Sequence, residues 1–123
     1  NVGADAIIVS NHGGRQLDGA ESAIRMLPRV LDAVGDKIEV HMDSGIRSGQ
    51  DVLKALALGA RGTYIGRSFV YGLGAMGQDG VTKALEIIQK ELETSMALCG
   101  LRTVDELSRG ILRIPKDFGG NWS

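Results

Sequence analysis

Three short, largely apolar segments alternate with longer amphipathic segments along this chain. The short segments span residues 6–10, 38–42 and 62–65, and each leads into a turn that contains glycine. Runs of this length and composition are typical of strands in a buried parallel sheet. The pattern therefore predicts three strands, each followed by a loop at its C-terminal end.

A helical pattern follows each predicted strand. Apolar residues recur at helical spacing over 23–34, where Pro28 predicts a kink or a restart. Residues 48–51 resemble a capping box, and the helix that they begin is expected to stop at Gly59. An apolar stripe over 81–99 predicts a third helix, and the glycines of 72–77 predict a helix–loop junction before it. Strand, turn and helix, repeated three times, predict βαβ units.

Three such units leave two architectures open. They could form a small open α/β layer, but three strands would then expose two bare sheet edges. They could instead be the terminal part of an eight-stranded (β/α)8 barrel, which needs about 200 residues or more. The chain has 123 residues and begins at Asn1, close to the first predicted strand, so we expect a piece of a longer protein. Residues 115–123 are glycine-rich and unpatterned, which predicts an extended C-terminal tail.

The composition and net charge argue against several classes of function and of site. Fourteen Lys and Arg against fifteen Asp and Glu give a net charge of −1, so no basic excess favours nucleic acid. No apolar run is long enough to predict a transmembrane helix. One cysteine excludes an internal disulfide, and no His or carboxylate spacing predicts a metal site. Glycine makes up 18 of the 123 residues, which is about twice its usual share of about 7%.

The loop after the first strand carries the densest polar cluster. Ser10, His12 and Arg15 stand within six residues, with two glycines between the histidine and the arginine. Strand C-terminal ends are where α/β folds build their sites. An imidazole exchanges a proton near neutral pH, and a guanidinium binds a carboxylate through two parallel hydrogen bonds. The cluster predicts a catalytic base beside a carboxylate clamp, against the simpler interpretation of a polar surface loop.

The next two loops predict a phosphate site. Asp43, Ser44, Gly45, Ile46 and Arg47 follow the second strand, and Gly66 and Arg67 follow the third. Phosphate is bound by amide N–H groups of glycine turns and helix N-termini together with guanidinium groups. Either arginine alone would indicate a solvated cation, but both together favour phosphate. His41 lies inside the second strand and is expected to be a hydrogen-bonded interior residue.

The sequence resembles the FMN-dependent α-hydroxy-acid dehydrogenases and oxidases, and within them the bacterial L-lactate dehydrogenase-like proteins. The resemblance rests on residues 10–18, 43–47, 51–60, 65–67, 91–92 and 96–100. It implies that residues 1–114 are strands six to eight, with their helices, of an FMN-binding (β/α)8 barrel.

The resemblance also implies roles for individual residues. His12 would remove a proton from a small L-2-hydroxy acid and Arg15 would bind its carboxylate. Ser10 would contact the flavin, while Asp43, Ser44, Gly45, Ile46, Arg47, Gly66 and Arg67 would hold the ribityl-phosphate end of FMN. The family's substrate tyrosines, its flavin-contacting lysine and the aspartate that orients the histidine belong to earlier strands. We therefore expect the isolated chain to be inactive.

Several alternatives stay open at this stage. The chain could be a non-catalytic phosphate- or FMN-binding fragment, or part of another FMN barrel such as an isomerase. The electron acceptor could be oxygen, a quinone or a cytochrome. For the full-length protein we expect a homo-oligomer, located in the cytoplasm or held peripherally at the inner membrane, with no nucleic-acid partner.

Overall fold

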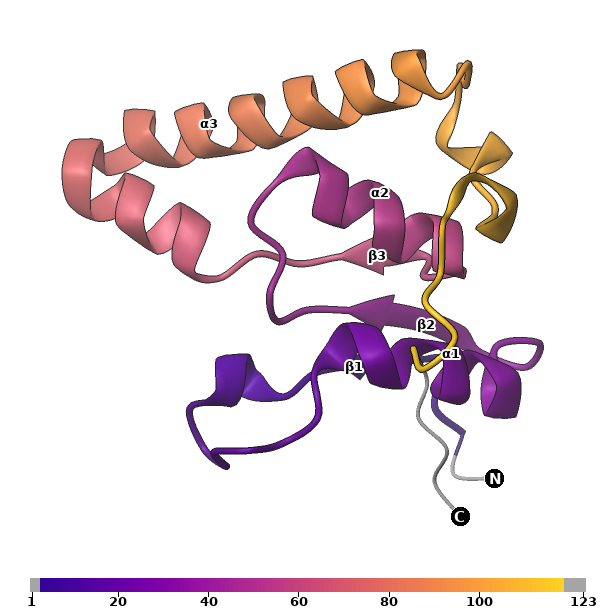
Figure 1. The fold of residues 1–123 in the computed structure, drawn as a ribbon. Helices are drawn as coiled ribbons and strands as arrows, with labels where there is room; N and C mark the ends of the chain where they lie inside the picture. Colours follow the sequence, from indigo (N-terminus) through magenta and orange to yellow (C-terminus); the bar gives the residue numbers. More distant parts are fainter. Residues whose placement is uncertain (1–2, 119–123) are drawn as a thin grey trace.

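A three-stranded parallel sheet forms the centre of the structure (Figure 1). The computed structural model describes residues 3–118. The strands β1 (Ala6–Val9), β2 (Glu39–Met42) and β3 (Gly62–Thr63) lie in the order β1-β2-β3. The register pairs Ile7 with Val40 and Met42 with Thr63. The three predicted parallel strands are therefore confirmed, although the third is only two residues long.

Helices follow the strands as expected. They are α1 (Ala23–Val34), α2 (Gly49–Leu58) and α3 (Arg67–Leu98), with short 3-10 helices η1 (His12–Gly14), η2 (Val104–Glu106) and η3 (Arg109–Ile111). α1 is continuous through Pro28, so of the predicted kink or restart the restart does not occur. Pro28 lies in the middle of α1, where its missing N–H removes one intrahelical hydrogen bond.

α3 consists of two helical segments joined by a sharp turn. Met76 and Gly77 leave helical geometry, and Gly77 has a φ of +60°. The predicted helix–loop junction is confirmed at this point. In Figure 1 the long second segment returns across α2. Its residues Ile88 and Leu92 pack against the core, but Leu85 and Cys99 of the predicted apolar stripe are exposed.

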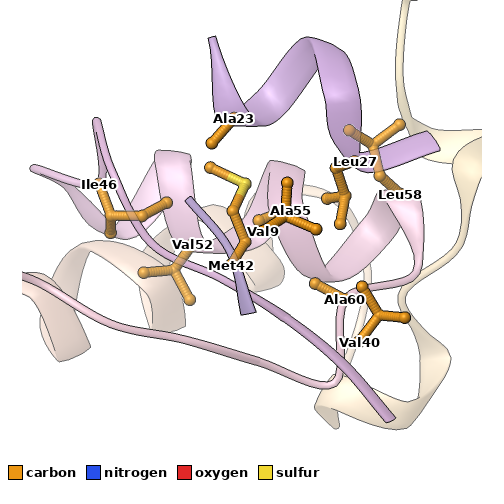
Figure 2. Packing of buried hydrophobic residues seen from close by; sticks show 10 residues of the cluster. All are labelled: Val9, Ala23, Leu27, Val40, Met42, Ile46, Val52, Ala55, Leu58 and Ala60. Atoms are coloured by element: carbon orange, nitrogen blue, oxygen red, sulfur yellow. The ribbon is translucent and has the colours of Figure 1, made fainter. Parts of the chain in front are cut away.

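The hydrophobic core lies between one face of the sheet and helices α1 and α2 (Figure 2). Strand residues alternate between the two faces of the sheet. The core cluster contains Val9, Ala23, Leu27, Val40, Met42, Ile46, Val52, Ala55, Leu58 and Ala60. Packing around this core places α1 against β1 and β2, and α2 against β3, and so holds the loops at the strand ends.

The opposite face of the sheet is open within residues 3–118. Ile8 is 52% exposed, and it pairs in register with His41, which pairs in turn with Gly62. The free edge of β1 has no partner strand in the same residue range. An uncovered sheet face and a bare edge are what a partial barrel would expose, because the barrel interior and the preceding strand cover them.

The C-terminal segment crosses back over the helices. Arg109 Nε donates to the carbonyl oxygen of Leu58 at 3.2 Å, and Phe118 packs against the core. Residues 115–118 form a turn in which Phe118 N donates to Pro115 O at 3.1 Å. The rest of the predicted tail, 119–123, lies outside the described residues. Over residues 3–118, no helix combines the length and the apolar composition needed to cross a bilayer.

Candidate active site

A cavity of about 450 Å³ opens at the C-terminal ends of the three strands. Its walls come from the loops that follow β1, β2 and β3, which the parallel sheet brings to one edge. Nine of the ten predicted site residues line it, namely His12, Arg15, Asp43, Ser44, Gly45, Ile46, Arg47, Gly66 and Arg67. The predicted base, the predicted carboxylate clamp and the predicted phosphate loops therefore share one space.

The loop after β1 places His12 and Arg15 on one wall of the cavity. His12 begins η1 with a φ of +53°, and Gly13 and Gly14 also have positive φ values. Arg15 N donates to the His12 carbonyl oxygen at 3.3 Å, which closes the turn. Both side chains are exposed. A proton acceptor and a planar cation are thus presented together to a molecule in the cavity.

Ser10, the tenth predicted residue, supports the loop from outside the cavity wall. Its hydroxyl oxygen accepts a hydrogen bond from His12 N at 3.0 Å and lies 3.3 Å from Ser44 Oγ. These contacts connect the end of β1 with the loop after β2.

The loop after β2 turns sharply at Ser44 and Gly45, whose φ values are +69° and +86°. Ile46 is only 5% exposed and belongs to the hydrophobic core, so it anchors the loop. Arg47 is exposed and lines the cavity. The loop therefore presents peptide groups and a guanidinium while its apolar side chain points into the protein.

The N-terminus of α2 is occupied by the protein's own groups. Ser48 and Asp51 form the predicted capping box, and Asp51 Oδ2 also accepts from Arg47 N at 3.0 Å. Glu91, on α3, accepts from Gly49 N at 2.8 Å. These carboxylates satisfy amide N–H groups that would otherwise attract an anion. The cap makes the beginning of α2 a structural joint rather than a phosphate site.

The N-terminus of α3 lacks such a cap. Gly66 precedes the helix and makes no side-chain capping bond. The first amide groups of a helix have no intrahelical acceptor, and the helix dipole favours an anion there. Arg67 lies in this first turn, and its Nη2 donates to the Gly13 carbonyl oxygen at 3.3 Å. Arg67 thereby links the predicted phosphate end of the cavity to the loop that carries His12.

Four exposed apolar or aromatic side chains that were not predicted from the sequence also line the cavity. Tyr64 follows β3, and Phe69, Val70 and Tyr71 lie in the first turns of α3. Their exposed fractions range from 36% to 70%. Three consecutive large side chains at the beginning of a helix break the usual amphipathic pattern, and this was the signal available in the sequence.

His41, which was expected to be a hydrogen-bonded interior residue, does not line the cavity. Its side chain is 18% exposed, and Nε2 lies 3.1 Å from Glu39 Oε2. Its Nδ1 is buried without a hydrogen-bond partner and faces Gly62. Across residues 3–118, His, Cys, Asp and Glu side chains do not gather in any group of three suited to a metal ion.

Comparison with protein families gives a match over residues 1–114 to the FMN-dependent dehydrogenases. Among curated proteins, an L-lactate dehydrogenase of Caulobacter sp. (strain K31) is 54% identical over 112 residues. The matched region covers 91% of this chain and 30% of that protein. The chain therefore spans about a third of the length of the relatives that it matches.

Solved structures agree with this match. A mandelate oxidase variant with the monooxide FMN adduct superposes with a TM-score of 0.82 at 50% identity, covering 87% of this chain and 34% of that one. A soluble mutant of the membrane-associated (S)-mandelate dehydrogenase from Pseudomonas putida gives a TM-score of 0.86 at 41% identity, covering 90% and 31%. Such structures are FMN-dependent (β/α)8 barrel enzymes, so the predicted fold, as part of such a barrel, is confirmed. FMN is likewise confirmed as the cofactor of the matching proteins. The chain belongs to the FMN-dependent dehydrogenase family.

Proposed function

We propose that the full-length protein oxidises a small, lactate-like L-2-hydroxy acid to the 2-oxo acid with FMN as cofactor. The observation that carries this proposal is the shared cavity, in which His12 and Arg15 lie beside the loops that carry Arg47 and Arg67. A 2-hydroxy acid needs a base for a proton and a cation for its carboxylate, and the flavin needs an anchor for its phosphate. L-Lactate and mandelate enzymes among the similar proteins support this substrate class.

In this proposal His12 acts as the base. It takes up a proton from the substrate while Arg15 binds the carboxylate and so fixes which part of the substrate faces the imidazole. FMN, when bound, would accept the two electrons and the second proton that the substrate loses. η1 holds both side chains on one short turn, so their relative position depends on local backbone geometry.

The cofactor's ribityl-phosphate end is assigned to Asp43, Ser44, Gly45, Ile46, Arg47, Gly66 and Arg67. The residues present fit a phosphate group, because the uncapped N-terminus of α3 and the positive-φ turn at Gly45 lie on the same cavity as two guanidinium groups. Ser10 is assigned to the flavin side of the site through its contacts with the His12 loop.

The remaining features of the full-length protein are also proposals. Residues 1–114 would form strands six to eight of the barrel, with 115–123 as a C-terminal tail. The isolated chain would be inactive, since it covers about 30% of its relatives. We propose a homo-oligomer that passes electrons to oxygen, a quinone or a cytochrome. The cytoplasm, or the periphery of the inner membrane, is the proposed location, and the membrane-associated mandelate dehydrogenase supports the second.

Anaerobic flavin reduction tests the proposal. Purified full-length protein should show flavin absorbance that bleaches on addition of L-lactate, glycolate or mandelate, with D-lactate as the control. His12→Ala should retain the flavin and lose the bleaching. Arg15→Ala should raise the apparent substrate dissociation constant, and Arg15→Lys should restore only part of it, because a lysine lacks the planar fork. Activity that survives in His12→Ala would refute the mechanism and would favour another FMN barrel, such as an isomerase.

A further inference from the structure

Ser44 lies at the centre of the hydrogen bonds that join the loop after β2 to the loop that carries His12. Its hydroxyl donates to Asp43 Oδ1 at 2.6 Å. The same oxygen accepts from Gly13 N at 3.1 Å and from Asn11 N at 3.3 Å. One side chain from the loop after β2 thus accepts hydrogen bonds from the amide groups on both sides of His12.

The chemistry of a hydroxyl makes this arrangement directional. A serine hydroxyl has one proton and two lone pairs. The short contact with the Asp43 carboxylate is the charge-assisted one, so it takes the proton. Both lone pairs are then left for donors, which the His12 loop supplies as the amides of Asn11 and Gly13, with the Ser10 hydroxyl oxygen also 3.3 Å away. Asp43 therefore orients Ser44, and Ser44 in turn orients the loop.

Backbone geometry gives a second, independent observation. Among the residues that the structure describes, the non-glycine residues with positive φ are His12 at +53° and Ser44 at +69°. Such conformations persist where surrounding contacts hold them in place. The Gly13 peptide beside His12 is held at both ends, because its N–H meets Ser44 Oγ and its carbonyl oxygen meets Arg67 Nη2 at 3.3 Å.

We propose that the Ser44 side chain is a positioning residue for His12, and that it acts on the loop rather than on the cofactor. The inference rests on the proposed function, in which His12 is the base. It assigns different roles to the backbone and to the side chain of Ser44. The backbone at 44–45 remains on the cavity wall for the phosphate, while the hydroxyl is committed to the amides of Asn11 and Gly13.

Two substitutions in the full-length protein test this inference. Ser44→Ala removes the hydroxyl and keeps a side chain at positive φ. Ser44→Gly removes the hydroxyl and also suits that φ, so it is expected to fold even where the alanine variant does not. Ser95→Ala is the matched control, because its hydroxyl donates only within α3, to Glu91 O at 2.7 Å. Hydrogen exchange of the peptide that contains residues 10–16 is measured with and without FMN, beside FMN affinity and the rate of flavin reduction.

Both Ser44 variants should speed exchange in the loop about fivefold or more, the factor that the net loss of one hydrogen bond corresponds to. The flavin reduction rate should fall about 10- to 100-fold, as a small misplacement of a catalytic group does. The FMN dissociation constant should stay at the wild-type value, and Ser95→Ala should change none of the three quantities.

Three results would overturn the inference. Weaker FMN binding with unchanged loop exchange would make the hydroxyl a cofactor ligand. Wild-type behaviour of Ser44→Gly, with only Ser44→Ala impaired, would assign the effect to backbone strain. Unchanged exchange and unchanged reduction in both variants would remove any positioning role. If the wild-type flavin is not reduced by any 2-hydroxy acid, the proposed function fails instead, and loop exchange still reports whether Ser44 holds the loop.

Discussion

The joint between α2 and α3 offers a sharp test of how this part of the fold is held together. Gly49 begins α2, is buried, and donates its N–H to Glu91 Oε2 on α3 at 2.8 Å. A Cβ at Gly49 would lie 2.5 Å from the Ile88 carbonyl oxygen and the Glu91 carbonyl carbon, and closer still to Leu92 N. Ordinary Cβ contacts begin at 3.4 Å, so Gly49→Ala requires the two helices to separate by about 1 Å.

The cost of Gly49→Ala has two parts. Overpacking a close contact costs about 1–3 kcal/mol. Separation of the helices also lengthens the Gly49–Glu91 hydrogen bond, and loss of a bond to a charged acceptor costs about 1.5–3 kcal/mol. We therefore expect a loss of about 3–5 kcal/mol in the free energy of unfolding, which is a large share of the 5–15 kcal/mol that typical proteins possess.

Thermal and denaturant unfolding of the full-length protein measure this loss. Gly74→Ala is the matched control, since a Cβ at Gly74 meets nothing within 4 Å and lies on a helix, where alanine is favoured by about 1 kcal/mol. Gly49→Ala should lower the unfolding midpoint by several degrees, and Gly74→Ala should leave it unchanged or raise it. Glu91→Gln, which keeps the volume and removes the charge, should cost less than Gly49→Ala. An unfolding midpoint for Gly49→Ala equal to that of the wild type would refute the close contact as a structural joint.

Two further predictions concern the N-termini of α3 and α2. Arg67→Ala should weaken FMN binding about 10-fold or more, because a charged hydrogen bond to the phosphate is lost. Riboflavin, which lacks the phosphate, should bind wild type and variant alike, and an equal loss for both ligands, measured by flavin fluorescence, would contradict a phosphate role. Ser48→Ala should cost about 1 kcal/mol of stability through the loss of the α2 cap, with FMN affinity unchanged. A cofactor defect in that variant would show that the beginning of α2 is part of the phosphate site after all.

Local sequence determined the elements and the candidate chemistry. Three short apolar runs and the helices after them were predicted in order, because burial on one sheet face requires that pattern wherever the chain folds. The break within α3 at Gly77 and the end of α2 at Gly59 followed from glycine, which adopts the positive φ that both positions have. His12, Arg15 and Arg67 were identified as candidates because strand ends concentrate functional side chains.

Tertiary structure decided which of those groups meet. The parallel register brings three loops to one cavity, and no local pattern states that Arg67 reaches the Gly13 carbonyl oxygen, 54 positions away. The cap of Glu91 on Gly49 depends on the return of α3 across α2, so the sequence alone could not separate a phosphate-binding helix end from a closed one. Pro28 stayed inside α1 because packing of the helix against the sheet outweighs one lost hydrogen bond. The hydrogen bond between Ser44 and the His12 loop was also decided by the tertiary structure, because the fold determines which groups lie close enough to a side chain to bond with it.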